Sequence, residues 1–413
     1  MAKNKIISAI DIGTTKITAL MAQIRDEDET RLHVIGVATT PSKGIRKGQI
    51  VNIDEAVSSI VEAVEAAERM AGYNLSRAWI SAGGSHIGSQ NSHGVVAVSQ
   101  PHGEIRSEDV HRVLDAAQAV SLPSSTEIIH VITRNFSVDS QEGVKDPIGM
   151  TGVRLEVDTH IVTGSTTGIK NLSKCISEVG CDIAGLVFSG LASSTAVLTD
   201  TEKELGVILI DVGGGTTDIA IYTDGALSYS SVLPIGAKNV TNDLAIGLRI
   251  SLESAEKIKL YLSQQKTPAD ELDLEKLNLS EEIKSVSFKT VVEGIIRPRL
   301  NEIFQLVAGE IKKSSLAGLT PAGVVLCGGG AMTVGITDSA KRTLSMPVRI
   351  GTPGGISGLI DDIETPAFAT SIGLLKYAVS QGEQVQIKGP SLDTIPGRGF
   401  IGKVTDMIKS LLP

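Results

Sequence analysis

Cysteine is scarce in this chain of 413 residues, and there is no excess of positive charge. The three cysteines, Cys175, Cys181 and Cys327, are an odd number without CxxC spacing. This excludes a disulfide framework, gives no indication of a zinc site and favours a reducing compartment. The 38 basic residues are outnumbered by 47 acidic ones, giving a net charge of −9. Because no basic stripe is available for a phosphate backbone, we do not expect nucleic acid as a partner.

Long apolar runs are also missing. No stretch approaches about 18 consecutive apolar residues, the length that a transmembrane helix needs. The apolar run that begins at Ile6 is interrupted by Asp11, far short of the apolar core of a signal peptide. We therefore predict no export by this route, and any contact with a membrane should be peripheral.

Apolar residues and glycine are abundant instead. Hydrophobic residues make up 41% of the chain, 43 residues are glycine and only 21% are charged. This composition excludes a disordered or collagen-like chain. At roughly 150 residues per domain, the length predicts two or three globular domains.

Apolar segments rich in β-branched residues alternate with segments of helical periodicity, which predicts an α/β protein. We expect a three-strand meander, a helix and a further strand at 6–12, 16–23, 33–39, 53–70 and 77–82. The rhythm then changes to strand, helix, strand and strand, at 94–98, 107–120, 128–138 and 151–162. We interpret residues 83–163 as an inserted α+β subdomain.

One sequence pattern occurs twice. The segment IDIGTTKI at 10–17 is echoed by IDVGGGTTDI at 210–219. In both copies an apolar strand ends in aspartate, turns through glycine and hydroxyl residues and resumes as a strand, which indicates a duplicated half-domain. A third glycine cluster at 328–330 follows an apolar strand at 323–327 and precedes a helix expected near 338–344.

The two repeated turns are suited to phosphate. Glycine lets the backbone approach closely, and successive N–H groups with threonine hydroxyls form a nest for an anion. Two such turns facing each other would clamp a polyphosphate, with Asp11 and Asp211 holding Mg²⁺ through its waters. Either turn alone would be read as an ordinary tight turn, but two copies in the same context favour the clamp. The cluster at 328–330 fits a nucleoside surface or a plain strand-to-helix turn equally well. Walker A and GxGxxG sequences are absent from these sites, which disfavours P-loop and Rossmann folds.

These segments match the phosphate-1, phosphate-2 and adenosine motifs of the actin/Hsp70/sugar-kinase superfamily. Within it, the chain closely resembles the FtsA family of bacterial cell-division proteins over essentially its whole length. The resemblance implies an actin-like two-lobed ATPase fold, of duplicated ribonuclease H-like domains, around a cleft for ATP and Mg²⁺. The implied domains are 1–82, 164–205 and 365–380 in lobe 1 (1A), 83–163 as the 1C subdomain, 206–238 and 302–364 in lobe 2 (2A), 239–301 as subdomain 2B, 381–398 as a flexible linker and 399–413 as an amphipathic membrane-targeting helix.

The resemblance also implies which residues meet the nucleotide. They are Gly13, Thr14, Thr15, Lys16, Gly213, Gly214, Gly215, Thr216, Thr217, Gly329, Gly330 and Ala331. Glu256 and Lys257 resemble residues that flank adenine or ribose, although a solvated helix face accounts for them equally well. Lys16 could also end a surface turn, and Asp218 has a weaker case for a phosphate contact. The catalytic residue is unknown, and weak or absent hydrolysis is compatible with tight ATP binding.

A proline-arginine segment lies in a helix expected at 287–311. Pro298 is compatible with that helix only as a kink or a helix start. Exposed arginines are usually unremarkable, but the resemblance implies that this subdomain docks the C-terminal tail of the tubulin-like protein FtsZ. Arg297, Arg299 and Asn301 would be the contacts, suited to an acidic peptide.

The C-terminal segment 399–413 is amphipathic. At about 100° per residue, its apolar residues share an arc of about 140°. The segment's apolar residues are Phe400, Ile401, Val404, Met407, Ile408, Leu411 and Leu412, and its lysines are Lys403 and Lys409. So short a helix is marginal alone in water, so its apolar face needs either the protein body or a membrane. The linker and the resemblance favour the membrane, with the lysines attracted to anionic lipid.

The resulting hypothesis is an ATP-binding adaptor that polymerises at the inner face of the cytoplasmic membrane, at the division septum. It would tether FtsZ filaments there and recruit later division proteins, with polymerisation multiplying weak anchors by avidity. One alternative is a soluble ATPase: a sugar kinase would need a catalytic aspartate and a sugar pocket, and an Hsp70-like chaperone a β-sandwich after the lobes. Another is a pilus or envelope scaffold resembling PilM. The insertion and the terminal helix favour the FtsA-like adaptor.

Overall fold

The computed structural model describes residues 5–24, 32–99, 103–265, 271–281, 283, 285–359 and 363–382. Within these ranges no helix is both long and apolar enough to cross a membrane. The expected linker beyond Gly382 and the amphipathic helix at 399–413 lie outside the described residues.

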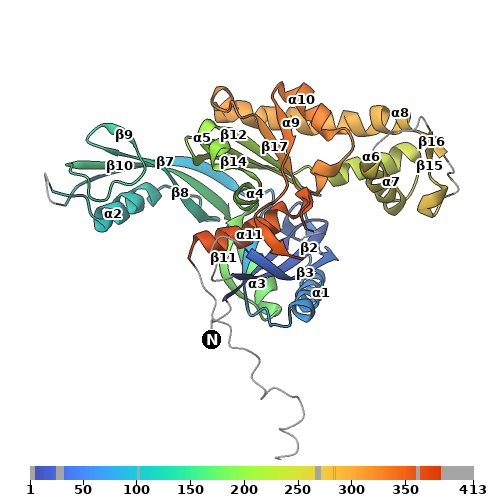
Figure 1. Ribbon diagram of the computed structural model, residues 1–413, viewed down its shortest axis with the longest axis horizontal. Coiled ribbons are helices and arrows are strands. Elements are labelled where there is room, and N and C mark those ends of the chain that lie inside the picture. Colours follow the sequence, from blue (N-terminus) through green and yellow to red (C-terminus); the bar gives the residue numbers. More distant parts are fainter. Residues whose placement is uncertain are drawn as a thin grey trace, which may run out of the picture.

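Two sheets with the same strand order form the core of the molecule (Figure 1). In each sheet an antiparallel meander of three strands is followed by a parallel strand beside the first. The first sheet has the order β11-β6-β1-β2-β3-β19, and the second, taken in the same direction, β18-β17-β12-β13-β14. This shared topology confirms the predicted duplication. The strands are β1 (Lys5–Ile12), β2 (Lys16–Ile24), β3 (Leu32–Pro41), β6 (Arg77–Ala82), β11 (Asp182–Phe188) and β19 (Ile356–Gly358) in the first sheet, and β12 (Val207–Val212), β13 (Thr217–Thr223), β14 (Ala226–Leu233), β17 (Val324–Cys327) and β18 (Val348–Ile350) in the second.

We call the first sheet with its helices lobe 1 and the second lobe 2. On lobe 1, α1 (Ile53–Ala71) and α3 (Thr166–Glu178) share a core with the outer face of the sheet. Two further helices, α4 (Ser189–Val197) and α11 (Ala369–Ser380), lie at the joint between the lobes, in one core cluster with residues of both sheets. They pack so closely that a Cβ on Gly373 would lie 1.8 Å from the Ala192 carbonyl oxygen. The joint is therefore a tightly packed pair of helices rather than a loose linker.

A four-stranded sheet with one helix forms the insertion, at one end of the molecule in Figure 1. Its strand order is β7-β10-β8-β9, and α2 covers one face over its own apolar core. The elements are β7 (Gly88–Ala97), α2 (Ser107–Gln118), β8 (Thr126–Val138), β9 (Gln141–Val144) and β10 (Arg154–Ser165). The expected elements are present, but β7 begins six positions earlier than predicted, at Gly88, and β9 was not predicted.

The segment expected to form subdomain 2B lies at the opposite end in Figure 1. Its elements are α6 (Ala237–Leu248), α7 (Leu252–Gln264), β15 (Glu271–Asp273), β16 (Ser285–Ser287) and α8 (Phe288–Val291). The helix expected at 287–311 is α8, one π-helical turn (Val292–Ile296) and then α9 (Arg297–Ser314). Pro298 lies in the first turn of α9, directly after the π-helical turn, and the backbone stays helical through this joint, so the expected alternatives of a kink or a helix start are met by an irregular turn within a longer helix. After β17 follow a short 3-10 turn (Gly329–Met332) and α10 (Ile336–Leu344).

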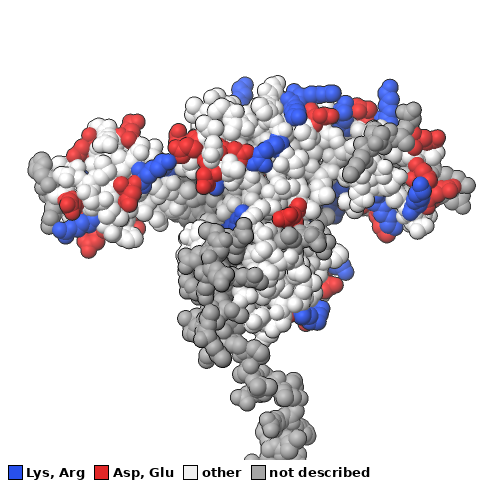
Figure 2. Space-filling model, viewed as in Figure 1, with Lys and Arg blue, Asp and Glu red and all other residues white. Residues whose placement is uncertain are grey.

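On the face drawn in Figure 2, basic and acidic side chains are interspersed over both the insertion and subdomain 2B. Neither end presents a patch of one charge sign on this face.

Candidate functional site

Each lobe contributes one glycine turn to the space between the sheets. In lobe 1 the turn joins β1 to β2, and the Gly13 N–H donates to the Lys16 carbonyl oxygen at 3.0 Å. In lobe 2 the turn joins β12 to β13, and the Gly213 N–H donates to the Thr216 carbonyl oxygen at 2.9 Å. The repeated sequence thus forms the same hydrogen-bonded turn twice.

The two turns meet at their tips. A Cβ on Gly214 would lie 1.9 Å from Thr15 Oγ1, and a Cβ on Gly215 would lie 2.7 Å from Thr14 Cγ2. Only glycine permits so close an approach of backbone to side chain. The glycines of lobe 2 therefore accommodate the threonines of lobe 1, and the structure brings the two predicted turns together.

A cleft of about 300 Å³ opens beside these turns. Of the residues predicted to bind nucleotide or metal, its lining includes Asp11, Gly13, Thr14, Thr15, Lys16, Asp211, Gly213, Gly214, Thr216, Glu256, Gly329 and Gly330. The remaining predicted contacts lie outside this lining. Gly215 packs against Thr14, and Ala331 is buried in the core of lobe 2. Thr217 is fully buried and donates its hydroxyl to the Ile235 carbonyl oxygen at 2.8 Å, so it supports the turn from behind.

Lys257 is likewise absent from the cleft lining. It pairs at 3.0 Å with Glu253 on the outer side of α7. Lys259 lines the cleft instead, and its Nζ lies 2.8 Å from Glu256 Oε2 and 3.0 Å from Thr241 Oγ1. Residues three apart share a helix face whereas adjacent residues do not, which explains why Glu256 and Lys259 act together.

Three carboxylates, those of Asp11, Asp211 and Asp218, also line the cleft. Desolvation by burial raises the pKa of Asp11 to about 6, although the nearby Lys16 opposes the shift. Burial raises the pKa of Asp211, and it raises that of Asp218 well above the usual value, with repulsion from Asp211 and Asp11 adding to the shift. This group of desolvated acids would be stabilised by a cation.

The fit of Mg²⁺ can be judged from the donor atoms themselves. Asp218 Oδ1 is buried and has no hydrogen-bond partner among the described residues. In the part of the chain that the structure describes, no three acidic, histidine or cysteine side chains converge closely enough to hold one ion directly. Mg²⁺ commonly keeps several waters and takes only one or two carboxylates plus phosphate oxygens. The residues present therefore fit an ion held partly through water.

Asp218 is the main residue that the sequence analysis undervalued. The register of β12 and β13 pairs Asp211 directly with Asp218. Residues directly opposite each other on an antiparallel pair lie close together on the same face. The turn comprises residues 213–216 and is flanked by Val212 and Thr217, which pair with each other. The next residue on each side is an aspartate, so pairing the strands outward from the turn would have identified Asp211 and Asp218 as neighbours.

Two neighbours shape the cleft beside the glycine turns. Lys16 Nζ lies 3.8 Å from the centre of the Phe368 ring, and burial lowers its pKa while Asp11 and Asp211 oppose that shift. Gly328 has a φ of 82°, and a Cβ there would lie 2.1 Å from Asp211 Oδ1. At Gly328, therefore, glycine lets the backbone pass beside an aspartate of the second lobe.

The predicted peptide contacts lie away from the cleft, near the start of α9. Arg299 is engaged within the protein: its guanidinium donates to both carboxylate oxygens of Asp243, at 2.5 and 2.9 Å, and to Glu302. Arg297 Nη1 pairs with Glu293 at 2.7 Å, and Asn301 is half-buried. An acidic peptide at this place would have to compete with these internal carboxylates.

Two family models match the chain. One, described as the SHS2 domain inserted in FtsA, covers residues 84–163, and the other, described as cell division protein FtsA, covers residues 208–373. Among curated relatives, cell division protein FtsA of Pseudomonas aeruginosa is 39% identical over 94% of this chain and 93% of its own length. The proteins of the same name from Bacillus subtilis and Escherichia coli K12 are 38% and 34% identical, over 94% and 90% of this chain and 88% and 90% of theirs.

Solved structures share the fold at low sequence identity. The PilM-PilN type IV pilus biogenesis complex matches with a TM-score of 0.64 at 14% identity, over 90% of this chain and 98% of the other. MreB5 of Spiroplasma citri bound to ADP matches with a TM-score of 0.53 at 13% identity, over 91% and 97%. The fold is thus that of the actin-like ATPases.

Proposed function

The chain belongs to the FtsA family of cell division proteins, and we propose that it binds Mg²⁺-ATP in the cleft and tethers FtsZ filaments to the inner face of the cytoplasmic membrane. As an actin-like cell division protein, it is expected to assemble with copies of itself and with division partners.

The observation that supports nucleotide binding is the meeting of two glycine turns from two lobes. The backbone N–H groups of each turn and the hydroxyls of Thr14 and Thr15 are suited to phosphate oxygens, because such donors need no counter-charge of their own. Lys16 supplies a partly desolvated cation, and Glu256 with Lys259 supplies polar groups for a ribose. Mg²⁺, when bound, would neutralise phosphate charge beside Asp11, Asp211 and Asp218. We assign no catalytic residue, and binding without rapid hydrolysis is sufficient for a conformational role.

The proposed membrane anchor is the amphipathic segment 399–413. Burying one large apolar side chain contributes about 1.5–3 kcal/mol, and each lysine near anionic lipid about 1 kcal/mol. A single helix of this kind binds reversibly, so self-assembly along the membrane would add avidity. We place the protein at the division septum as a peripheral component that recruits later division proteins.

The proposed FtsZ contact is the arginine-containing start of α9. Arg297, Arg299 and Asn301 present donors at the surface of subdomain 2B, where Asp243, Glu293 and Glu302 already balance their charge. We propose that the acidic tail of FtsZ exchanges with these internal carboxylates, which would make the contact weak and reversible.

Flotation with anionic liposomes in Mg²⁺-ATP tests the tether. The intact chain should float and carry FtsZ with it, and FtsZ without its C-terminal tail should stay behind. Leu411→Asp should remain in solution because it places a charge on the apolar arc. Ser410→Asp, the same charge on the polar arc, should float like the intact chain.

Two results would contradict the tether. If Leu411→Asp floats as well as Ser410→Asp, the terminal segment is not the anchor. If the chain floats but never carries FtsZ, the adaptor role is wrong and a membrane-bound scaffold for another partner becomes the better account.

A further inference from the structure

Three side chains from three separate elements meet at the base of the cleft. Ser193 of α4 donates its hydroxyl to Asp211 Oδ2, and Thr370 Oγ1 of α11 donates to the same oxygen at 3.0 Å. The two hydroxyl oxygens lie 3.0 Å from each other. Both Ser193 and Asp211 are buried, and Thr370 lines the cleft. The carboxylate at the end of β12 is therefore held by one residue from each helix of the interlobe joint.

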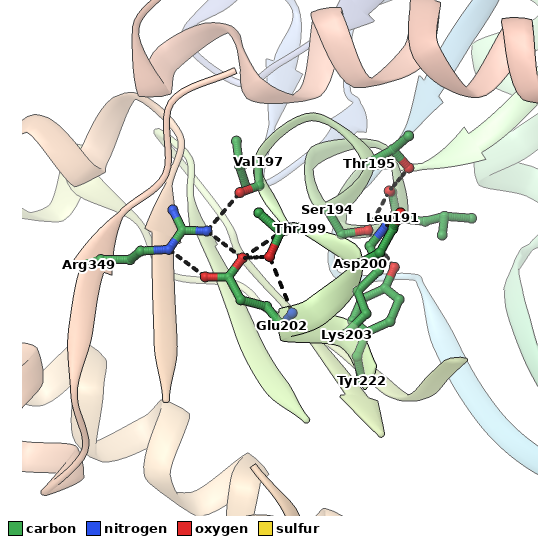
Figure 3. Close-up of polar contacts among 10 residues, drawn as sticks. All are labelled: Leu191, Ser194, Thr195, Val197, Thr199, Asp200, Glu202, Lys203, Tyr222 and Arg349. Atoms are coloured by element: carbon green, nitrogen blue, oxygen red, sulfur yellow. Dashed lines mark hydrogen bonds and ion pairs between the residues drawn. The ribbon is translucent and has the colours of Figure 1, made fainter. Parts of the chain in front are cut away.

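At the C-terminal end of α4, the Arg349 guanidinium forms a second set of hydrogen bonds between this helix and lobe 2 (Figure 3). Arg349 of β18 donates to the Val197 carbonyl oxygen at 2.8 Å and to both carboxylate oxygens of Glu202, at 2.6 and 2.7 Å. Glu202 belongs to α5 (Asp200–Leu205) and forms a capping box with Thr199. Hydrogen bonds at Ser193 and at Val197 thus connect α4 to lobe 2.

The other helix, α11, packs most closely against α4 and, of the two sheets, against that of lobe 1. It contacts β1, β2 and β6 of that sheet as well as α4. The bond from Thr370 to Asp211 therefore runs from the lobe 1 side of the joint to lobe 2. Any rotation of α11 against α4 changes the position of the Thr370 hydroxyl relative to the Asp211 carboxylate.

The cluster has fewer hydroxyl protons than hydrogen-bond acceptors. Ser193 Oγ also lies 2.9 Å from the Ser189 carbonyl oxygen, so its single proton has two competing acceptors. An ionised Asp211 attracts the protons of both Ser193 and Thr370, because bonds to a charged acceptor are the stronger ones. The Asp211 carboxylate is therefore the acceptor that α4 and α11 share.

We propose that Ser193 and Thr370 are positioning residues that aim Asp211 at the Mg²⁺ of a bound nucleotide and that, through Asp211, link occupancy of the cleft to the angle between α4 and α11. This rests on the proposed binding of Mg²⁺-ATP. Partners in such an outer shell fix the orientation of a ligating carboxylate, and their loss typically costs about 10- to 100-fold in metal affinity.

The chain offers a matched control one residue away. Ser194 is as fully buried as Ser193 and also lies on α4, but its hydroxyl is bonded to the Leu191 carbonyl oxygen and to Tyr222, away from the cleft (Figure 3). Ser193→Ala and Ser194→Ala therefore remove the same atom from the same helix. Thr370→Val removes the second hydroxyl at nearly constant shape, and Thr370→Ser restores it.

The experiment measures the dissociation constant for ATP in excess Mg²⁺ and in EDTA, with the full chain. The dissociation constant in EDTA divided by that in Mg²⁺ measures how strongly ATP binding depends on the metal. We expect this ratio to fall about tenfold in Ser193→Ala and in Thr370→Val. Ser194→Ala and Thr370→Ser should keep the ratio of the unaltered protein. Hydrogen exchange at the first turn of α11 should slow when Mg²⁺-ATP is added to the unaltered protein and not in Thr370→Val.

The inference is overturned if Ser193→Ala keeps the ratio of Ser194→Ala and Thr370→Val keeps that of Thr370→Ser. Should Ser193→Ala fail to fold, the Thr370 pair decides alone, because that position is only half-buried. An unaltered protein that binds no ATP, or binds it equally in Mg²⁺ and EDTA, refutes the proposed Mg²⁺-ATP binding itself and this inference with it.

Discussion

The two glycine turns have the same backbone shape but different side chains. Where lobe 1 has Thr14, Thr15 and Lys16, lobe 2 has Gly214, Gly215 and Thr216 in the equivalent places. The residue across from the strand-end aspartate is Thr18 in lobe 1 and Asp218 in lobe 2. The first turn thus carries hydroxyls and a cation, and the second carries bare backbone and an extra carboxylate.

This difference shows how a duplicated unit builds one asymmetric site. Threonine side chains from one turn need glycines in the other to approach, so the two cannot both be threonine-rich. A cation on one side and paired carboxylates on the other suit a phosphate chain with its metal. Both halves keep the same fold, but one supplies the hydroxyls and the cation and the other supplies the glycine backbone and the extra carboxylate. Neither half could form this site alone.

Removing the cation from the first turn should have the largest effect. Lys16→Met should weaken ATP binding about 100-fold, because truncating one partner of a buried charge pair costs about 2–5 kcal/mol. AMP binding should weaken far less, since AMP lacks the outer phosphates. Fluorescence titrations with both nucleotides measure this, with Lys43→Met, an exposed lysine, as the control. An equal loss for AMP and ATP would mean that Lys16 supports the fold rather than a phosphate.

Crowding the second turn should have the next largest effect. Gly214→Ala places a methyl group against Thr15, and overpacking of this kind costs about 1–3 kcal/mol, so ATP affinity should fall about tenfold if the methyl group separates the turns. Adding Thr15→Ala to Gly214→Ala should recover part of the loss, which calorimetric titration can measure. Gly309→Ala, where a Cβ meets nothing within 4 Å, is the control. Failure of the second substitution to relieve the first would show that the turns do not work as a pair.

Making the second turn resemble the first should have a smaller and more specific effect. Asp218→Thr gives lobe 2 the residue of lobe 1 and should lower the Mg²⁺ dependence of ATP binding about tenfold. Without nucleotide and metal, thermal unfolding should shift upward, because a desolvated carboxylate with a raised pKa is removed. Asp200→Thr, at a fully exposed aspartate, controls for loss of charge. A lower melting temperature with unchanged Mg²⁺ dependence would assign Asp218 to structure alone.

The two sheets also differ at the outer strand of each meander. The prediction from this difference, a change in melting temperature with pH, is the smallest of the expected effects. The last strand of the lobe 1 meander, β3, pairs with the backbone of β19, whereas its counterpart in lobe 2, the edge strand β14, is covered by side chains of the insertion. Ser89 and Asn91 donate to the Ser230 and Ser228 carbonyl oxygens, and His160 lies 2.8 Å from Ser230 Oγ. This contact is therefore sensitive to acid at one buried imidazole.

Burial lowers the pKa of His160 from 6.5 to about 4, and Arg134 adds to the shift. Because the unfolded chain takes up this proton first, stability is present above pH 6.5 and is lost as the pH falls toward 4. Lowering the pH from 7 to 5 should reduce the melting temperature less in His160→Gln than in the unaltered protein, by about 2–4 °C. His111→Gln, on the exposed side of α2, should behave like the unaltered protein. If the melting temperature falls equally between pH 7 and pH 5 in both variants, His160 is not the group that destabilises the protein in acid.

The parts of the fold that the sequence predicted are those with local signals. The repeated turns, their flanking strands and α1 each carry their pattern within one short segment. β7 was predicted too short because its first half is polar, and it is extended by pairing with β10 and by docking on β14. β9, only four residues long, has no alternation of its own and forms because β8 offers a free edge.

The candidate site was predictable only where its residues are contiguous. Ser193 and Thr370 are 177 positions apart, in segments for which the sequence predicted no site residue. Only the packing of α4 against α11 brings them to Asp211. Lys259 was missed for a simpler reason, since choosing between it and Lys257 required the rotation of α7 about its axis.

The most direct test of the central claim is a titration of the unaltered full chain with ATP and with AMP, each in Mg²⁺ and in EDTA. Two turns that clamp a polyphosphate around a metal predict that ATP binds much more tightly than AMP in Mg²⁺, and that this preference shrinks in EDTA. Equal affinity for ATP and AMP under both conditions would contradict the clamp, since the turns would then contribute nothing to recognition of the phosphates.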